Sequence, residues 1–155
     1  MTREEYLKKL IQTTRNKTKD KQAANASKYP QGFFKKKSCR HCGNEFIPKA
    51  PSELYCSETC RKYGVTEAYY RRVYGITIEQ YLDIAERQKY KCAICGQDNF
   101  QMKDCSSGAL VVDHDHTTGK VRGLLCHNCN RALGLLQDNK SYLQSAINYL
   151  KKCND

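Results

Sequence analysis

The chain has 155 residues, enough for one ordinary domain or two small ones. It carries 27 Lys and Arg against 16 Asp and Glu, and this formal charge of +11 favours nucleic acid as a partner, because cations near phosphates release condensed counterions. A merely solubilising basic surface is the alternative. No apolar run approaches the ~20 residues that cross a bilayer, and the opening MTREEYLKKL lacks a signal-peptide core, so we expect a cytoplasmic protein with no membrane partner.

The ten cysteines are distributed unevenly. Eight of them form four close pairs: Cys39/Cys42, Cys56/Cys60, Cys92/Cys95 and Cys126/Cys129. In a chain without a secretion signal such pairs are typical of zinc ligands, whereas in a secreted chain they would be disulfide candidates. Cys105 and Cys153 stand alone, and we interpret them as incidental thiols.

Residues 1–38 are predicted to form a short helix followed by a basic arm. Thr2 and Glu5 have the spacing of a capping box, and an apolar stripe follows at helical spacing: Tyr6, Leu7, Leu10 and Ile11. From Thr13 to Lys28 the sequence is polar and basic without an apolar period. This stretch is expected to be a flexible arm that contacts phosphates or only aids solubility.

Residues 39–64 read as a zinc module with the pattern C-x2-C-x13-C-x3-C. Gly43 supplies a turn, and Phe46 and Tyr55 supply a minimal core. So short a segment cannot bury enough apolar surface alone, so the metal must provide the folding energy. The pattern does not say whether the module binds nucleic acid, binds protein or braces its neighbour.

Residues 65–91 are predicted to be a helical linker. Thr77 and Gln80 fit a second capping box, followed by an apolar face of Ile78, Tyr81, Leu82 and Ala85. Just upstream, aromatic and basic residues alternate: Tyr69, Tyr70, Arg71, Arg72 and Tyr74. Such a mixture can stack bases and neutralise phosphates, although tyrosines at helical spacing more often form a core or an interface.

Residues 92–155 are predicted to form a zinc-clamped unit. Residues 110–112 and 121–125 read as two strands joined by a Gly-containing turn. A helix is expected to start near Asn130, and another from Ser141, with Gln144 completing its capping box. The second cysteine set, Cys92, Cys95, Cys126 and Cys129, would clamp this ββα arrangement.

Between these cysteine pairs, the segment LVVDHDHTTGKVRG holds candidate catalytic residues. Asp113 and Asn130 offer hard oxygen ligands for Mg²⁺, and His114 is a candidate base, since an imidazole exchanges protons near neutral pH. Arg122 and Lys120 could grip phosphate. Neighbouring strand residues face opposite ways, so Asp113 and His114 converge only if the strand bends between them. A zinc site made by the DHDH segment itself, or a solvated turn without activity, is the alternative.

The pattern YGIT-x-EQY…CAICG…VVDHDH…GKVRGLLC-x2-CN, over residues 74–138, resembles the phage recombination endonuclease VII family of His-Me finger (HNH-like) nucleases. The resemblance implies that the second cysteine set holds zinc, that Asp113 and Asn130 bind the catalytic Mg²⁺, and that His114 is the general base. His116 matches a second active-site histidine. Leu133 stands where the best-known member has an acidic residue.

The expected fold is therefore a small α+β, zinc-stabilised one, with a ββα-metal (His-Me finger) nuclease core, an N-terminal four-cysteine zinc module and connecting helices. The expected function is that of an HNH-type DNA endonuclease with two structural zinc ions and catalytic Mg²⁺ or Mn²⁺. Its substrate would be branched, homing-site or general duplex DNA, in the bacterial host cytoplasm if the chain is phage-encoded; a homodimer is left open. A non-catalytic double-zinc regulator is the alternative, and a zinc-organised protein adaptor a third hypothesis.

Overall fold

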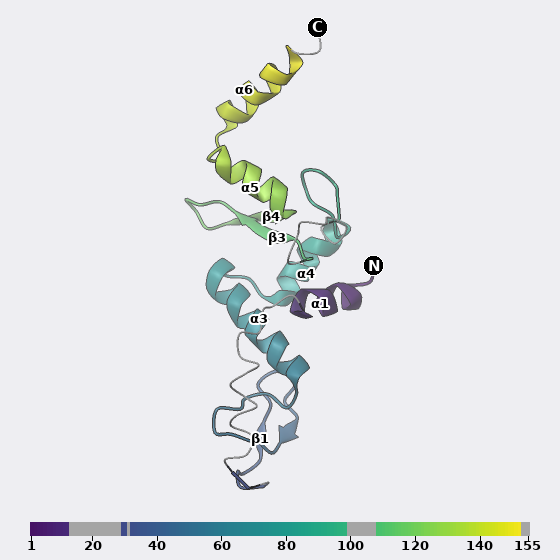
Figure 1. Cartoon of the computed structure of the whole chain (residues 1–155), viewed down its shortest axis with the longest axis vertical. Helices are drawn as coiled ribbons and strands as arrows, with labels where there is room; N and C mark the ends of the chain where they lie inside the picture. Colours follow the sequence, from purple (N-terminus) through teal and green to yellow (C-terminus); the bar gives the residue numbers. More distant parts are fainter. Residues whose placement is uncertain (13–28, 31, 99–107, 153–155) are drawn as a thin grey trace. The chain divides into compact units, whose positions relative to one another are not determined.

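The computed structural model describes residues 1–12, 29–30, 32–98 and 108–152. These form two compact units, Met1–Asp83 and Ile84–Asp155 (Figure 1). The predicted basic arm and the two lone cysteines, Cys105 and Cys153, lie outside the described residues. In the described part of the chain, no helix has the length and hydrophobicity needed to cross a membrane.

The first unit combines three helical segments with a two-stranded ladder. Its elements are α1 (Arg3–Gln12), β1 (Lys37–Ser38), β2 (Glu45–Phe46), α3 (Glu58–Tyr74) and the start of α4 (Ile78–Arg87). The strands β1 and β2 pair antiparallel, and α1 packs against α3. The helix α3 begins inside the first cysteine module, so that module and the expected linker share one helix.

Both predicted capping boxes in this unit are present. Thr2 N–H donates to Glu5 Oε2 at 2.9 Å, and Glu5 N–H donates back to Thr2 Oγ1 at 3.2 Å. Thr77 and Gln80 make the same reciprocal pair at 2.8 and 3.0 Å. Each box satisfies backbone donors that a helix start leaves without an intrahelical acceptor, and so defines where α1 and α4 begin.

The core of the first unit is built around tyrosines. Tyr6 and Tyr81 are fully buried, and their hydroxyl oxygens lie 3.1 Å apart. The ring of Tyr70 lies 5.0 Å from that of Tyr81, and burial raises the pKa of Tyr70. Tyr70 is therefore half-buried against the core, while Tyr69 keeps 44% of its surface exposed. The predicted apolar face of α4 is confirmed, since all four of its residues are buried: Ile78, Tyr81, Leu82 and Ala85.

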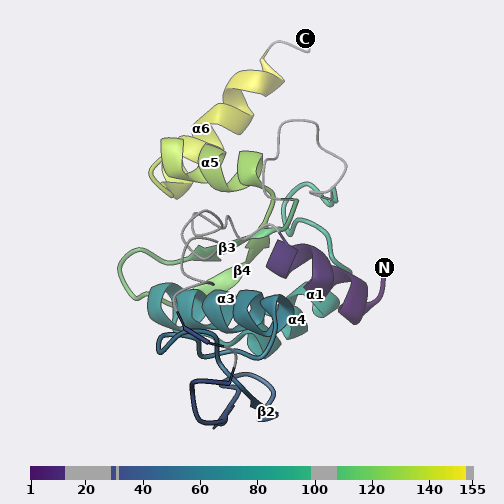
Figure 2. The same cartoon turned by 60° about the horizontal axis from the view of Figure 1, so that its bottom comes forward.

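The second unit contains the predicted ββα arrangement (Figure 2). The strands β3 (Val111–His114) and β4 (Val121–Leu125) pair antiparallel, and α5 (His127–Leu135) follows directly and packs on both. The helix α5 starts earlier than expected, because Cys126 is its N-cap and its sulfur accepts the N–H of Cys129.

The C-terminal helix α6 (Lys140–Lys151) starts differently from the prediction. The proposed capping box at Ser141 is wrong, because Asn139 is the N-cap and its Oδ1 accepts the N–H groups of Ser141 and Tyr142 at 2.8 and 3.2 Å. No residue of α6 is buried, and its apolar side chains include Ile147, 48% exposed, and Leu150, 64% exposed.

Gln88, just after α4, joins the chain to the outer edge of β4. Its Nε2 donates to the carbonyls of Leu124 and Lys91 at 2.8 and 2.9 Å, and its Oε1 accepts the Leu124 N–H at 2.9 Å. A Cβ on Gly123 would stand 3.0 Å from Gln88 Oε1. Gly123 thus leaves room for the side-chain amide of Gln88. This amide pairs with backbone N–H and C=O groups at the edge of β4 that a two-stranded hairpin would leave without partners.

We predict that Gln88→Leu destabilises the second unit by about 1–3 kcal/mol, because the buried Leu124 N–H loses its acceptor. Thermal unfolding followed by circular dichroism measures this loss. Gln144→Leu is the matched control, since Gln144 is exposed and donates to the exposed Asn148 on the surface of α6, and it should change stability by no more than about 0.5 kcal/mol. Equal melting temperatures for the two variants would contradict the role assigned to Gln88.

Candidate functional site

The eight paired cysteines gather into two clusters of four, as their spacing predicted. The clusters are Cys39, Cys42, Cys56 and Cys60, and Cys92, Cys95, Cys126 and Cys129; within each, the sulfur atoms lie within 4.8 Å of one another. Three of these separations are 3.5 Å (Cys42–Cys56), 3.6 Å (Cys56–Cys60) and 3.7 Å (Cys95–Cys126). Four thiolates at ~2.3 Å around a tetrahedral zinc stand about 3.8 Å apart, so both sets fit that ion.

The two clusters use the same backbone turn at their first pair. The N–H of Gly43 donates to the Cys39 carbonyl at 3.0 Å, and that of Gly96 donates to the Cys92 carbonyl at 2.9 Å. In each turn the first cysteine N–H donates to the carbonyl five residues further on. Gly43 and Gly96 have φ of 76° and 67°, a region that side chains disfavour, which is why glycine follows each pair.

These turns prepare the first cysteine of each cluster as a thiolate. Burial raises the pKa of the Cys39 and Cys92 thiols, but the backbone N–H groups around each sulfur outweigh burial. They lower the pKa to about 6 at Cys39 and about 7 at Cys92. Since the thiolate is the metal ligand, Cys39 and Cys92 are suited to bind zinc at neutral pH, whereas hydrogen bonds with Cys42 and Cys60 raise the pKa of Cys56 to about 12.

The second pair of each cluster lies at a helix start. Ser57 caps α3 and its Oγ accepts the Cys60 N–H at 3.1 Å, whereas Cys126 itself caps α5. The exposed His41 stacks its ring on Tyr63 of α3 with centroids 3.9 Å apart. His127 is exposed as the first residue of α5. The first cluster thus joins its loop to α3, and the second joins the hairpin to α5.

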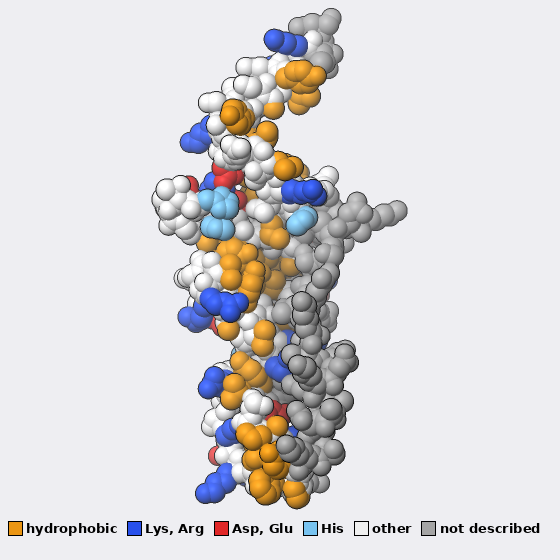
Figure 3. Space-filling view, turned by 60° about the vertical axis from the view of Figure 1, so that its left-hand side comes forward, with side chains coloured by type: hydrophobic (Ala, Val, Ile, Leu, Met, Phe, Trp, Pro, Cys, Tyr) orange, Lys and Arg blue, Asp and Glu red, His pale blue; other side chains and the backbone are white. Residues whose placement is uncertain are grey.

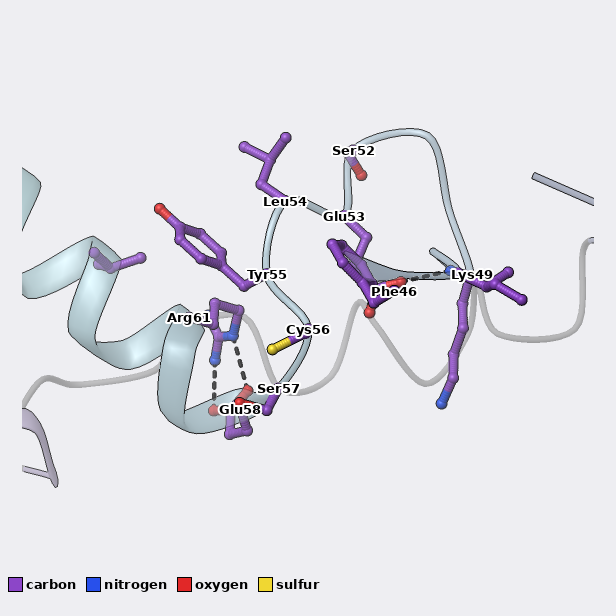
Figure 4. Close-up of a pocket in the computed structure, with 12 residues that line it drawn as sticks. Phe46, Lys49, Ser52, Glu53, Leu54, Tyr55, Cys56, Ser57, Glu58 and Arg61 are labelled. Atoms are coloured by element: carbon purple, nitrogen blue, oxygen red, sulfur yellow. Dashed lines mark hydrogen bonds and ion pairs between the residues drawn. The ribbon is translucent and has the colours of Figure 1, made fainter. Parts of the chain in front are cut away.

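A pocket of about 440 Å³ lies beside the first cluster (Figure 4). All its lining residues fall between Phe46 and Val65 in the sequence. Arg61 on its wall donates to both carboxylate oxygens of Glu58, at 2.8 and 2.7 Å. A Cβ on Gly64 would clash with the ring of Tyr55, so a side chain at that helix position would displace the ring. The pocket therefore belongs to the first module.

A β-bulge lies opposite the step from Asp113 to His114. Asp113 faces Gly123 across the hairpin, but His114 faces Val121, so Arg122 is an extra residue on β4. A bulge bends the strand that carries it and increases the local twist, and here that strand is β4. The convergence of Asp113 and His114 on one site stays a prediction.

The bulged Arg122 clamps Asp113. Its Nε donates to Asp113 Oδ2 at 2.7 Å and its Nη2 to Oδ1 at 2.8 Å, while Asp113 is only 8% exposed. Nη2 also donates to Asp138 Oδ2 at 3.2 Å. The hydrogen bonds that Arg122 donates, chiefly to Asp113 and then to Asp138, raise the pKa of Arg122, so its charge is permanent. Arg122, expected to grip phosphate, here orients a carboxylate.

The two histidines adjoin this ion-pair cluster. The rings of His114 and His116 have centroids 5.0 Å apart, and His116 Nε2 lies 3.8 Å from Asp138 Oδ2. Figure 3 shows histidine side chains gathered beside acidic and basic ones. Asp138 was not predicted as a site residue, because it lies outside every motif in the sequence. The one feature that could have pointed to it is that it is an acidic residue directly after a predicted helix.

The remaining candidate residues are Asp115, Lys120 and Asn130. Asp115 Oδ1 accepts the N–H groups of Thr117 and Thr118 at 2.9 and 2.8 Å, so it builds the hairpin turn, and these donors, Thr118 first, lower its pKa. Lys120 is exposed at the end of that turn. Asn130 is half-buried in the first turn of α5, the helix that packs on β3 and β4.

Comparison with known proteins identifies the family. The model of the family described as recombination endonuclease VII matches residues 67–152. The chain belongs to the recombination endonuclease VII family. It is therefore a nuclease, an endonuclease that acts on DNA, and the resemblance predicted over residues 74–138 is confirmed.

Relatives come from bacteriophages. The Gene 59 protein of Mycobacterium phage D29 is 38% identical over 129 residues, which cover 76% of this chain and 75% of that protein. The Gene 59 protein of Mycobacterium phage L5 is 35% identical over 127 residues, covering 75% and 74%. A crystal structure of the ββα-Me type II restriction endonuclease Hpy99I matches with 24% identity and a TM-score of 0.37, over 80% of this chain and 60% of that one.

We predict two zinc ions per chain, one in each cluster, measured by elemental analysis of the purified protein. Cys129→Ser should lower the content to one, because three remaining thiolates hold zinc more weakly than four. Cys105→Ser is the control and should retain two, since Cys105 has no partner at ligand spacing in the sequence. A content of two in Cys129→Ser would rule out the second cluster as described.

Proposed function

We propose that the chain is a Mg²⁺-dependent endonuclease of the HNH type, in which Asp113 and Asn130 hold the cation and His114 is the general base. The observation that carries this proposal is the nearly buried Asp113, clamped by Arg122 at a bulge next to His114. Nothing in a simple hairpin requires such an arrangement, whereas hydrolysis needs an oriented carboxylate beside a base.

The donors fit a hard cation. A carboxylate has about four lone-pair positions, and Arg122 takes one on each oxygen of Asp113, so acceptor capacity remains for Mg²⁺. Asn130 offers an amide oxygen from the helix that packs on this hairpin. When bound, Mg²⁺ would act as a Lewis acid at the scissile phosphate and stabilise the leaving oxygen.

The remaining steps belong to the protein's own residues. His114 takes a proton from the attacking water at an imidazole nitrogen, and His116 lies close enough to contact the same phosphate region. Lys120, exposed on the hairpin turn, neutralises phosphate charge. The clamp on Asp113 means that the cation's ligand needs no reorientation when substrate binds.

Zinc has a separate, structural task in this proposal. The second cluster includes Cys126, which follows β4 and caps α5, so zinc there keeps Asn130 in register with the hairpin. The first cluster supports a module that contributes DNA affinity. Because relatives are phage proteins, we place the activity in the host cytoplasm, on branched, homing-site or general duplex DNA.

His114→Ala should abolish nicking of supercoiled plasmid in Mg²⁺ or Mn²⁺, because the attacking water loses its base, while the Kd for DNA changes less than about threefold. Gel assays of nicking and fluorescence anisotropy measure the two effects. His127→Ala is the matched control, an exposed histidine at the start of α5, and should nick like the unmodified protein. DNA binding without cleavage by the unmodified protein in any divalent metal would support the regulator hypothesis instead.

Cys56→Ser should raise the Kd for DNA about tenfold or more and leave the single-turnover rate at saturating DNA nearly unchanged, because it disrupts the first cluster alone. Cys105→Ser is the control. Substrates should include duplex, nicked, flapped and four-way-junction DNA, which also reveals the preferred structure. A variant that binds normally but cleaves slowly would contradict the affinity role of the first module.

A further inference from the structure

Asp138 lies in a turn with an unfavourable backbone. Gln137 and Asp138, directly after α5, have φ of 55° and 53°, in the left-handed region that non-glycine residues rarely occupy. Two backbone hydrogen bonds close the turn: Gln137 N–H donates to the Gly134 carbonyl and Asp138 N–H to the Leu133 carbonyl, both at 3.0 Å. Such strain persists where the surrounding structure holds it, and it often accompanies function.

The side chain of Asp138 reaches the clamp on Asp113. Its Oδ2 accepts from Arg122 Nη2 at 3.2 Å, and the same Nη2 donates to Asp113 Oδ1 at 2.8 Å. Arg122 is 37% exposed at the bulge, where one ion pair alone would leave the long side chain free to turn into solvent. The second carboxylate fixes the guanidinium plane from a different element.

Asp138 also changes the charge that a cation meets. Asp113 and Arg122 alone sum to zero, whereas the three groups together carry one negative charge. Because two carboxylates share Arg122, its positive charge offsets less of the negative charge of Asp113. Asp113 therefore attracts a divalent cation more strongly than it would if Arg122 paired with it alone. His116 Nε2, 3.8 Å from the same Oδ2, places this carboxylate beside the histidine pair as well.

We propose that Asp138 is a positioning residue of the nuclease centre, which holds Arg122 in the clamp on Asp113 and thereby maintains the affinity of Asp113 for the catalytic cation. The proposal rests on the proposed function, in which Asp113 is a cation ligand. Asp138 acts through Arg122 and does not itself touch substrate.

The direct test is cation binding by Asp138→Asn, a variant of nearly equal shape without the charge. Zinc-loaded protein is titrated with Mn²⁺ and free Mn²⁺ is measured by electron paramagnetic resonance, with Asp113→Ala defining binding at other places. The Kd for Mn²⁺ should rise about tenfold, with an unchanged circular dichroism spectrum. Asp83→Asn is the matched control, because Asp83 also pairs with an arginine, Arg3, at 2.9 Å, and its Kd should match the unmodified protein.

A double-variant cycle tests whether the effect passes through Arg122. In the Arg122→Gln background, Asp138→Asn should change the Kd less than about threefold, since the group that it positions is gone and only the direct attraction between the Asp138 charge and the cation is lost. A full tenfold change in that background, or an unchanged Kd for Asp138→Asn alone, would overturn the proposal.

Failure of this inference is distinguishable from failure of the proposed function. If Asp113→Ala binds Mn²⁺ as the unmodified protein does, then Asp113 is not a cation ligand and the proposed function fails. If Asp113→Ala loses the ion and Asp138→Asn keeps it at full affinity, the inference alone is wrong.

Discussion

The second unit depends on the junction at Cys126. This one residue follows β4, caps α5 with its sulfur and belongs to the second four-cysteine cluster. Because the cluster also contains Cys92 and Cys95, the junction ties the segment after α4 to both the hairpin and the helix. Gln88 adds a second connection along the edge of β4. A hairpin and a nine-residue helix would be only marginally stable alone, so these cross-links supply stability that a large hydrophobic core would otherwise provide.

On this braced hairpin, a single irregularity creates the candidate site. The extra residue in β4 is Arg122, and it brings a guanidinium onto Asp113 where a regular ladder would have continued the alternation. The charge cluster then extends through Asp138 to His116, and through the paired rings to His114. Residues from β3, β4 and the turn after α5 therefore share one electrostatic environment. The hydrolytic role that we propose needs such an arrangement, since a cation ligand and a base must keep their orientation while substrate exchanges.

Much of this could be predicted from local patterns. Cysteine spacing predicted both clusters, and the capping boxes at Thr2 and Thr77 predicted two helix starts. These features depend on residues a few positions apart. The predicted start of α6 was wrong because Asn139 competes with Ser141 for the same backbone donors, and sequence spacing alone does not rank two nearby capping residues. Tyr70 was ambiguous for a related reason, since only the structure shows that its ring packs against the buried Tyr81.

The sequence by itself determined the chemistry that is present: eight thiols in ligand pairs, a DHDH segment next to them, a basic charge and a pattern specific to one nuclease family. Only the tertiary structure decided which groups meet. It placed Arg122 on Asp113 through a bulge, and it brought Asp138 to the same guanidinium from the end of α5. The reason is physical: ligand spacing and helix caps are short-range, whereas an ion pair between distant residues depends on strand register and on where a helix ends.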